Sequence, residues 1–193
     1  GVSSGTWTTS GTGTFINDLA LSTEYTPSAA DITAGSVTLT ITTPSNGTCL
    51  AASDDMVLTI EDLPTAEAGP DQAVCDITAV TMAGSIGGGA TTYAWTHDGG
   101  GLFANPAIAA AVYTPVAGDV GTTVTMTLTT DATSECPAAV DMMTVTFDAQ
   151  PTADAGSDQT ICETTTSIML SGTVGGGVSS GTWTTSGTGT FIN

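Results

Sequence analysis

The sequence predicts an all-β fold in which small two-sheet sandwich domains repeat along the chain. Three observations predict it. Residues 1–17 return without a mismatch as residues 177–193. Several segments alternate apolar residues with threonine, and no segment carries apolar residues at helical spacing over three turns. Because identity over seventeen residues at a period of 176 indicates a tandem array, we expect this sequence to be one window on a longer polymer.

A weaker repeat inside this period divides it between two alternating domain types. The segment PTAEAGPDQAVC at 64–75 returns as PTADAGSDQTIC at 151–162. Further matches are Trp95 with Trp183 and Trp7, YTPVAGDV (113–120) with YTPSAADI (25–32), AGSIGGG (83–89) with SGTVGGG (171–177), VTMTLTT (124–130) with VTLTITT (37–43), and Cys136 with Cys49. Each domain is therefore about 88 residues long.

These matches set the predicted domain boundaries. A complete type-A domain is predicted at 64–150. Residues 1–63 should form the C-terminal part of a type-B domain whose first strands are missing, and residues 151–193 the N-terminal part of the next type-B domain. We expect neighbouring repeats of the same polypeptide to complete both parts. Residues 1–17 and 177–193 should then share one local fold.

Apolar residues at every second position predict the individual strands, because side chains of a strand point alternately to its two faces. The alternating sets are Val37, Leu39 and Ile41; Val80, Met82, Gly84 and Ile86; Val124, Met126 and Leu128; and Met143, Val145 and Phe147. Clusters of Gly, Asp, Asn and Pro between them are typical of hairpin loops. Ala29 to Gly35 is the one segment expected to form a short helical turn. Six or seven short strands per domain, with tryptophan in the third, predict an immunoglobulin-like sandwich.

The charge composition excludes several classes of partner. The chain has no Lys or Arg and carries a formal charge of −19, so nothing in it can neutralise the phosphates of a nucleic acid or of an anionic membrane surface. Charged residues make up only 10% of the chain, which is too sparse for a disordered acidic tail. No run approaches the roughly 18 apolar residues of a membrane helix, so we expect no membrane insertion in this segment.

The combined motifs resemble a known family. AGPDQAVC at 68–75, the tryptophan-containing strand, YTPSAADITAGSVTLTITT at 25–43 and the cysteine before the last strand are similar to the PKD-like and immunoglobulin-like tandem repeats of giant Bacteroidota surface adhesins, including gliding adhesins of the SprB type. The resemblance implies export through the outer membrane, display as long surface filaments, adhesion and gliding. It does not imply catalysis. The complete lack of Lys and Arg is a departure, because such repeats approach it but need not reach it.

The four cysteines predict disulfide bonds in an oxidising, extracellular setting, because no CxxC spacing suggests zinc or redox chemistry. Pairing within a domain would join Cys75 to Cys136, and Cys162 to the next copy's equivalent of Cys49. Closing such a loop would stabilise a small domain by roughly 4 kcal/mol. The alternative is pairing across a junction, since one cysteine precedes the second strand and the other precedes the last.

Acidic residues gather at the two predicted domain junctions. Because carboxylate oxygens are the ligands that Ca²⁺ prefers, they are candidates for a calcium site, against the alternative of solvated acidic loops. The candidates are Glu61, Asp62, Glu67 and Asp71 at one junction and Asp148, Asp154 and Asp158 at the other. Only three residues separate Phe147, the end of the last strand, from Pro151, so adjacent domains should hold a restricted angle.

The aromatic and histidine positions predict no catalytic site. Trp95 is expected in the core, although a carbohydrate platform is the alternative. His97, the only histidine, is expected in a solvent-facing loop. We therefore expect a structural repeat of a cell-surface filament or adhesin stalk, whose partners are adjacent repeats, other filament strands or surface glycans. The alternative is a glycan- or calcium-binding module of a secreted protein.

The missing basic residues predict that the native filament resists trypsin, which cleaves after Lys and Arg. With no surface ion pairs to screen, the free energy of unfolding should depend on salt only through relief of acidic self-repulsion. Incubation of the purified filament with trypsin, followed by gel electrophoresis, should leave the chain intact. Rapid fragmentation would show that the native chain differs from this sequence.

Overall fold

The computed structural model describes residues 4–192, and its regular secondary structure is nearly all β-strand. The chain forms two compact units. The first comprises the residues up to Thr65 together with Ile86–Thr91 and Thr130–Ala139, and the second comprises Ala66–Ser85, Thr92–Thr129 and Val140 onward. The repeat boundaries at 63/64 and 150/151 follow the sequence pattern and stay a prediction.

The only helices among the described residues are short. Helix α1 spans Ala29–Ala34, and a single 3₁₀ turn, η1, spans Ala117–Asp119. Ser28 caps α1, since its hydroxyl accepts a hydrogen bond from the Asp31 amide. The chain leaves α1 through Gly35 in the left-handed conformation (φ 73°). The structure thus confirms the short helical turn expected between Ala29 and Gly35.

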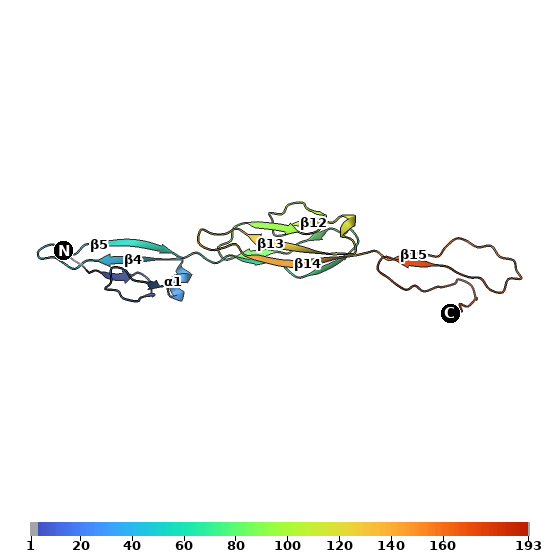
Figure 1. Cartoon of the computed structure of the whole chain (residues 1–193), viewed down its shortest axis with the longest axis horizontal. Coiled ribbons are helices and arrows are strands. Elements are labelled where there is room, and N and C mark those ends of the chain that lie inside the picture. The colour runs from blue at the N-terminus through green and yellow to red at the C-terminus, as the bar shows by residue number, and fades with distance from the viewer. Residues whose placement is uncertain (1–3, 193) are drawn as a thin grey trace. The chain divides into compact units, whose positions relative to one another are not determined.

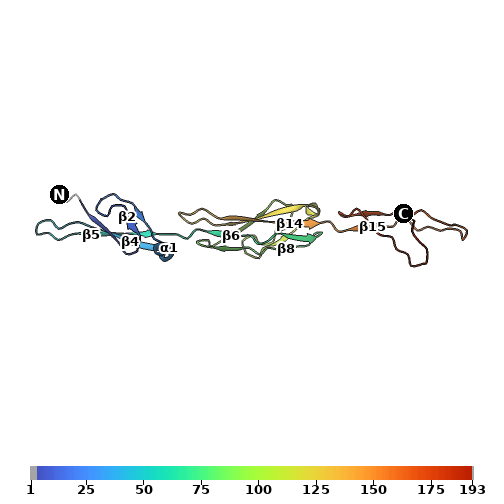
Figure 2. The same ribbon diagram turned by 90° about the horizontal axis from the view of Figure 1, so that it is seen from below.

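The first unit contains a three-stranded antiparallel sheet of order β1-β4-β5, made of β1 (Thr6–Thr9), β4 (Ser36–Thr42) and β5 (Ser53–Thr59). A second ribbon pairs β2 (Thr14–Phe15) with β3 (Tyr25–Thr26). Val37 and Leu39 are buried, as their alternation with threonine predicts. Figures 1 and 2 both show α1 at one end of β4.

The second unit is built around a four-stranded sheet of order β10-β13-β14-β7. Its strands are β10 (Tyr93–His97), β13 (Thr123–Thr130), β14 (Val140–Asp148) and β7 (Gln72–Cys75). A three-stranded sheet has the order β11-β12-β8, with β11 (Leu102–Phe103), β12 (Val112–Thr114) and β8 (Val80–Thr81). Strands β6 (Thr65–Glu67) and β9 (Ser85–Gly87) form a separate pair. Strand β14 pairs antiparallel with β13 and parallel with β7.

The core of the second unit lies where its two larger sheets meet. The alternating residues of β13 and β14 are buried as predicted: Val124, Met126, Leu128, Met143, Val145 and Phe147. From the opposite sheet, the ring of Tyr113 lies 6.0 Å from that of Phe147 between centroids. Trp95 is only 3% exposed, which confirms it as a core residue.

A buried carboxylate organises the loops beside this core. Asp119 is 3% exposed and accepts hydrogen bonds from the Tyr113 hydroxyl (2.9 Å), the Val116 amide (3.0 Å) and the Gly100 amide (2.7 Å). Burial raises the pKa of the Asp119 carboxyl, but these donors lower it by more, so that it lies below its ordinary value. Burial also raises the pKa of Tyr113 to about 12.

The first unit repeats this arrangement around Asp31, which is 2% exposed. Its carboxylate accepts hydrogen bonds from the Tyr25 hydroxyl (2.8 Å) and from the amides of Ser28, Thr12 and Gly13 (2.9 Å each). The amide donors of Ser28 and Thr12 are the main cause that lowers the pKa of Asp31 to about 2. The motif YTPxxxD therefore encodes a tyrosine–aspartate cluster that sequence analysis did not assign.

The repeated seventeen-residue segment adopts two different conformations. In its first copy, β1 pairs with β4, and β2 pairs with β3. In its second copy, residues 180–192 form no strand, so the expectation of one local fold is wrong; residues 1–3 and 193 lie outside the described residues. A local turn persists in both copies, because the Gly11 amide donates to Thr9 Oγ1 and the Gly187 amide to Thr185 Oγ1, each at 3.0 Å. Strands need partners along the chain, whereas this turn does not.

The C-terminal segment shows the same dependence on partners. Only β15 (Thr152–Asp154) and β16 (Thr173–Gly175) pair there, in a two-stranded antiparallel ribbon. Trp183 is 40% exposed, although the equivalent Trp95 is buried. This segment therefore pairs only two short strands and leaves its tryptophan partly exposed.

We expect Asp119→Ala to lower the free energy of unfolding by about 3 kcal/mol, because it leaves the Tyr113 hydroxyl and two amides without their acceptor. Urea denaturation of the full chain at neutral pH measures this. Asp158→Ala is the matched control, since Asp158 is exposed and should change stability by less than about 0.5 kcal/mol.

Asp119→Ala should also change the pH dependence of the free energy of unfolding. The folded pKa of Asp119 lies below the ordinary 3.8, so its contribution is fully present above about pH 4 and is lost as pH falls through the folded pKa. Stability curves from pH 5 to pH 2 should be flatter for Asp119→Ala than for the parent chain. Comparing the slopes of the two stability curves removes the effect of general acidic repulsion, which both chains share. Parallel curves would contradict a stabilising role of the ionised Asp119 carboxylate.

Candidate functional site

The predicted junction residue Glu61 lies in a cluster of the first unit, between β5 and β6. Its carboxylate accepts hydrogen bonds from Ser134 Oγ (2.5 Å) and from the Glu135 amide (3.1 Å). The side-chain bond to Ser134 is the main cause that lowers the pKa of Glu61. The thiol of Cys136 lies 3.8 Å from the Glu61 carbonyl oxygen and donates to it. The loop before β14 is therefore fastened to the chain after β5 through both the side chain and the backbone of Glu61.

Two glycines, one at each predicted junction, fit tightly against the preceding backbone. Gly88 has a left-handed conformation (φ 62°), and a β-carbon there would overlap the carbonyl oxygen of Leu63. Gly176 repeats this at the start of the next domain, with φ 71° and the same close approach to the carbonyl of Gln150. Only glycine tolerates both the conformation and the contact. The matching GGG runs of the sequence were the signal for this shared geometry.

The structure does not gather the predicted calcium candidates. Asp71 Oδ1 accepts a hydrogen bond from the Thr144 amide at 2.7 Å, which lowers the pKa of Asp71. Asp154 Oδ1 accepts one from the Gly156 amide at 2.8 Å. The remaining candidates are exposed: Asp62, Glu67, Asp148 and Asp158. Among residues 4–192, no three acidic, histidine or cysteine side chains form a group that could hold a metal ion. Calcium at the junctions stays a prediction.

The expected bond between Cys75 and Cys136 is absent from the structure, in which all four cysteines are free. Strand register explains why. Cys75 ends β7 opposite Asp148, the last residue of β14, whereas Cys136 precedes the first residue of β14, Val140. At roughly 3.3 Å per residue, β14 spans about 26 Å, far beyond the roughly 4.4–6.8 Å between the Cα atoms of a disulfide. Sequence spacing alone did not reveal that the two lie at opposite ends of one strand.

The other two cysteines are exposed and free. Cys49 sits in a tight loop, where Asn46 and Cys49 form a backbone bridge. Cys162 lies in the C-terminal segment, and Thr164 Oγ1 is 3.4 Å from its sulfur. This contact lowers the pKa of the Cys162 thiol.

His97 is half-buried rather than solvent-facing, which corrects the sequence expectation. It ends β10, and its ring lies edge-on to Tyr113 at 4.8 Å and to Phe103 at 5.4 Å between centroids. Its Nδ1 lies 3.1 Å from the carbonyl oxygen of Gly99. These contacts make His97 part of the aromatic packing around Tyr113. The second domain type has Thr185 at the equivalent position.

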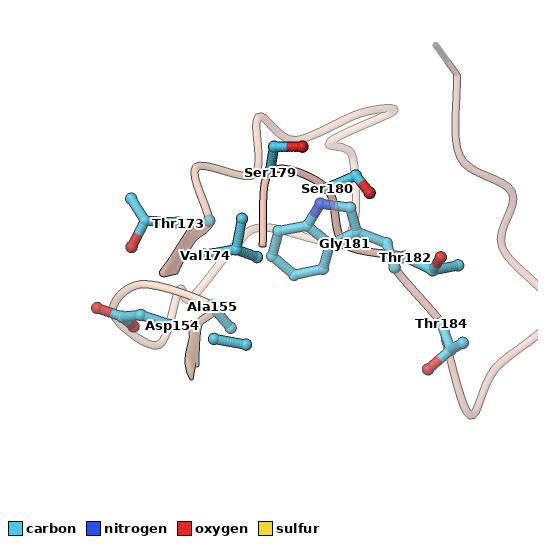
Figure 3. Close-up of a pocket in the computed structure, with 12 residues that line it drawn as sticks. Asp154, Ala155, Thr173, Val174, Ser179, Ser180, Gly181, Thr182 and Thr184 are labelled. Carbon is cyan, nitrogen blue, oxygen red and sulfur yellow. The ribbon is translucent and has the colours of Figure 1, made fainter. Parts of the chain in front are cut away.

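A cavity of about 520 Å³ lies in the C-terminal segment. Figure 3 shows Thr173 and Val174 on one side and Thr182 and Thr184 on the other. Trp183 also lines it. Because Gly172 contacts the Trp183 ring as Gly84 contacts Trp95, this cavity corresponds to the inner face of a domain. In the second unit Leu128 of β13 reaches that place beside Gly84.

Comparisons with known proteins assign no family. No protein-family model matches the sequence, and no curated protein matches it. In the described part of the chain, no helix has the length and apolar character needed to cross a membrane.

We expect Glu61→Ala to speed hydrogen exchange of the Glu135 amide, because the substitution removes the carboxylate that accepts from it. Exchange measured by NMR on the full chain reports this residue directly. Asp62→Ala is the matched control, as Asp62 is an exposed neighbouring carboxylate, and it should leave the Glu135 amide unchanged. Equal exchange in both variants would mean that the Glu61 cluster does not hold the loop.

Proposed function

We propose that this chain is a structural repeat of a long extracellular filament or adhesin stalk made of immunoglobulin-like, PKD-like domains. The observation that carries the proposal is the identity of residues 1–17 and 177–193 at a period of 176. Such an array would extend an adhesive or gliding apparatus away from the cell surface. Its partners would be adjacent repeats, other filament strands and surface glycans.

The two partial segments support this proposal because their missing pieces are complementary. The C-terminal segment has β15 and β16 and an uncovered Trp183. The first unit has β4 and β5, the equivalents of β13 and β14, without the equivalent of β7. In a tandem array, a copy of residues 18–63 follows residues 151–193. Ile41 of that copy, the equivalent of Leu128, would then cover Trp183.

The junction chemistry also favours an extended array. Glu61 fastens the end of one domain to the loop of the next through Ser134 and Glu135. Both junctions begin with proline and carry the same left-handed glycine against the preceding backbone, Gly88 and Gly176.

The alternative is a glycan- or calcium-binding module, and the cavity beside Trp183 is the observation in its favour. An exposed indole in a cavity of about 520 Å³ has the chemistry of a sugar platform. Completion of the domain by the next repeat would fill this same cavity. A glycan site there therefore requires that the C-terminal segment stays uncovered in the native protein.

Electron microscopy of native material tests the proposal. With roughly 3.3 Å per strand residue, one domain should span ~35–40 Å and the two-domain repeat ~70–80 Å. We expect thin filaments with that axial period. Compact, separate particles would contradict a filament, and glycan-dependent binding by such particles would favour the alternative.

A further inference from the structure

We propose that disulfide bonds link each domain to the one that follows it. The cysteine that ends the β7-type strand of one domain bonds to the cysteine in the loop before the last strand of the next. Thus Cys75 bonds to Cys49 of the following copy, and Cys162 bonds to Cys136 of the following copy. This inference rests on the proposed tandem array.

The first half of the geometry comes from the complete type-A domain. Strand β7 runs parallel to β14, and Cys75 is the register partner of Asp148. The amide of the next residue, Asp76, donates to the Asp148 carbonyl oxygen at 2.7 Å. The side chain of Cys75 is exposed, so it lies outside the core and is open to another chain segment. A β7-type cysteine therefore lies beside the last residue of its own domain's final strand.

The second half comes from the cluster around Glu61. The last strands match at DMMTVTF (141–147) and DDMVLTI (54–60), so that Glu61 occupies in the type-B domain the place of Asp148. The sulfur of Cys136, which belongs to the following domain, lies 3.8 Å from the Glu61 carbonyl oxygen. Its domain's loop is held there by Ser134 and Glu135.

Taken together, these contacts predict that both cysteines of a junction lie beside the same residue of the preceding domain, the one that follows or ends its last strand. In the complete array, a copy of Cys162 would be the register partner of Glu61, at the roughly 4.8 Å that separates neighbouring strands. Cys136 already contacts the same backbone group. A disulfide needs Cα atoms roughly 4.4–6.8 Å apart, and in the proposed array both cysteines would lie beside the same residue, Glu61. Pairing within one domain would instead have to bridge the length of β14.

The junction between 150 and 151 has the same design with the domain types exchanged. Asp148 takes the place of Glu61, and Cys75 lies beside it. Cys49 of the following type-B domain is the equivalent of Cys136. Gly176 reproduces the contact of Gly88 with the preceding backbone. Under this pairing each of the four cysteines has its partner in another copy of the repeat, which accounts for four free thiols in a single copy.

Formation of each bond is a two-electron oxidation. Thiol–disulfide exchange with an external disulfide supplies the oxidant: the two cysteine thiols lose two protons and two electrons, and one S–S bond forms. The external disulfide accepts them, its S–S bond breaks, and it leaves as two thiols.

A chain with two consecutive copies of residues 1–176 tests the proposal, because it contains one complete pair of each kind. The chain is refolded with oxidised glutathione at low concentration, and the monomeric fraction is digested without reduction by a protease that cleaves before Asp. Mass spectrometry should detect peptides that join Cys75 to Cys49 and Cys162 to Cys136. The two expected bonds use four of the eight cysteines in this chain, so four thiols should stay free. Peptides that join Cys75 to Cys136, or a folded chain in which all eight thiols stay free, would overturn the proposal.

Position-specific variants establish which copies are linked. Cys49→Ser in the second copy should abolish the peptide that joins Cys75 to Cys49, whereas the same substitution in the first copy should leave it. Cys136→Ser should behave in the same way for the bond to Cys162. Loss of the linked peptide from the first-copy variant would mean pairing within one copy and would overturn the inference.

The outcome is distinguishable from failure of the filament proposal. Circular dichroism of the two-copy chain shows whether its domains fold, and microscopy of native material shows whether filaments exist. Native filaments with free cysteines would contradict the disulfide linkage, whereas the proposal of a structural filament repeat would stand. Linked cysteines in the two-copy chain, if native material forms no filaments, would contradict the filament proposal, whereas the disulfide linkage would stand.

Discussion

The absence of any Lys or Arg is the constraint on which the rest of this structure depends. A carboxylate that leaves water must find hydrogen-bond donors, and here those donors can only be amides and hydroxyls. Asp119 meets the requirement with Tyr113 and the amides of two loops, and Asp31 does the same in the first unit. Each aspartate thereby joins backbone segments that strand pairing alone would leave separate. The loops that close the core take their shape from these acceptors.

Carboxylates also accept hydrogen bonds from backbone amides away from the core. Asp98 accepts from the Thr125 amide, Asp141 from the Ala68 amide and Asp71 from the Thr144 amide. At the junction, Glu61 accepts from Ser134 and Glu135. Several acidic residues in this chain therefore act as hydrogen-bond acceptors for backbone amides, in the core, at strand ends and in loops.

The parts of the fold that depend on local pattern could be predicted from the sequence. The alternation of Val124, Met126 and Leu128 identified a buried strand face, and YTPSAADI contained the turn that became α1. Side-chain partners at long range could not be predicted. Spacing predicted that Cys75 and Cys136 share a domain, but it did not reveal that β7 runs parallel to β14, which places the two cysteines at opposite ends of that strand. The identical segments around Trp7 and Trp183 differ in conformation, because a strand forms only where a partner strand is present. Trp7 has such a partner, since it lies opposite Ile41 of β4.

The parallel pairing of β7 with β14 also determines how a type-A domain would carry tension. Strand β7 lies near the start of the domain and β14 ends it. A pull on the two ends of the domain draws these adjacent strands in opposite directions along their common axis. The hydrogen bonds from Gln72 to Cys75 are then loaded together in shear, and they must break as a group. A ribbon pulled open from one end would lose them one at a time, at a lower force.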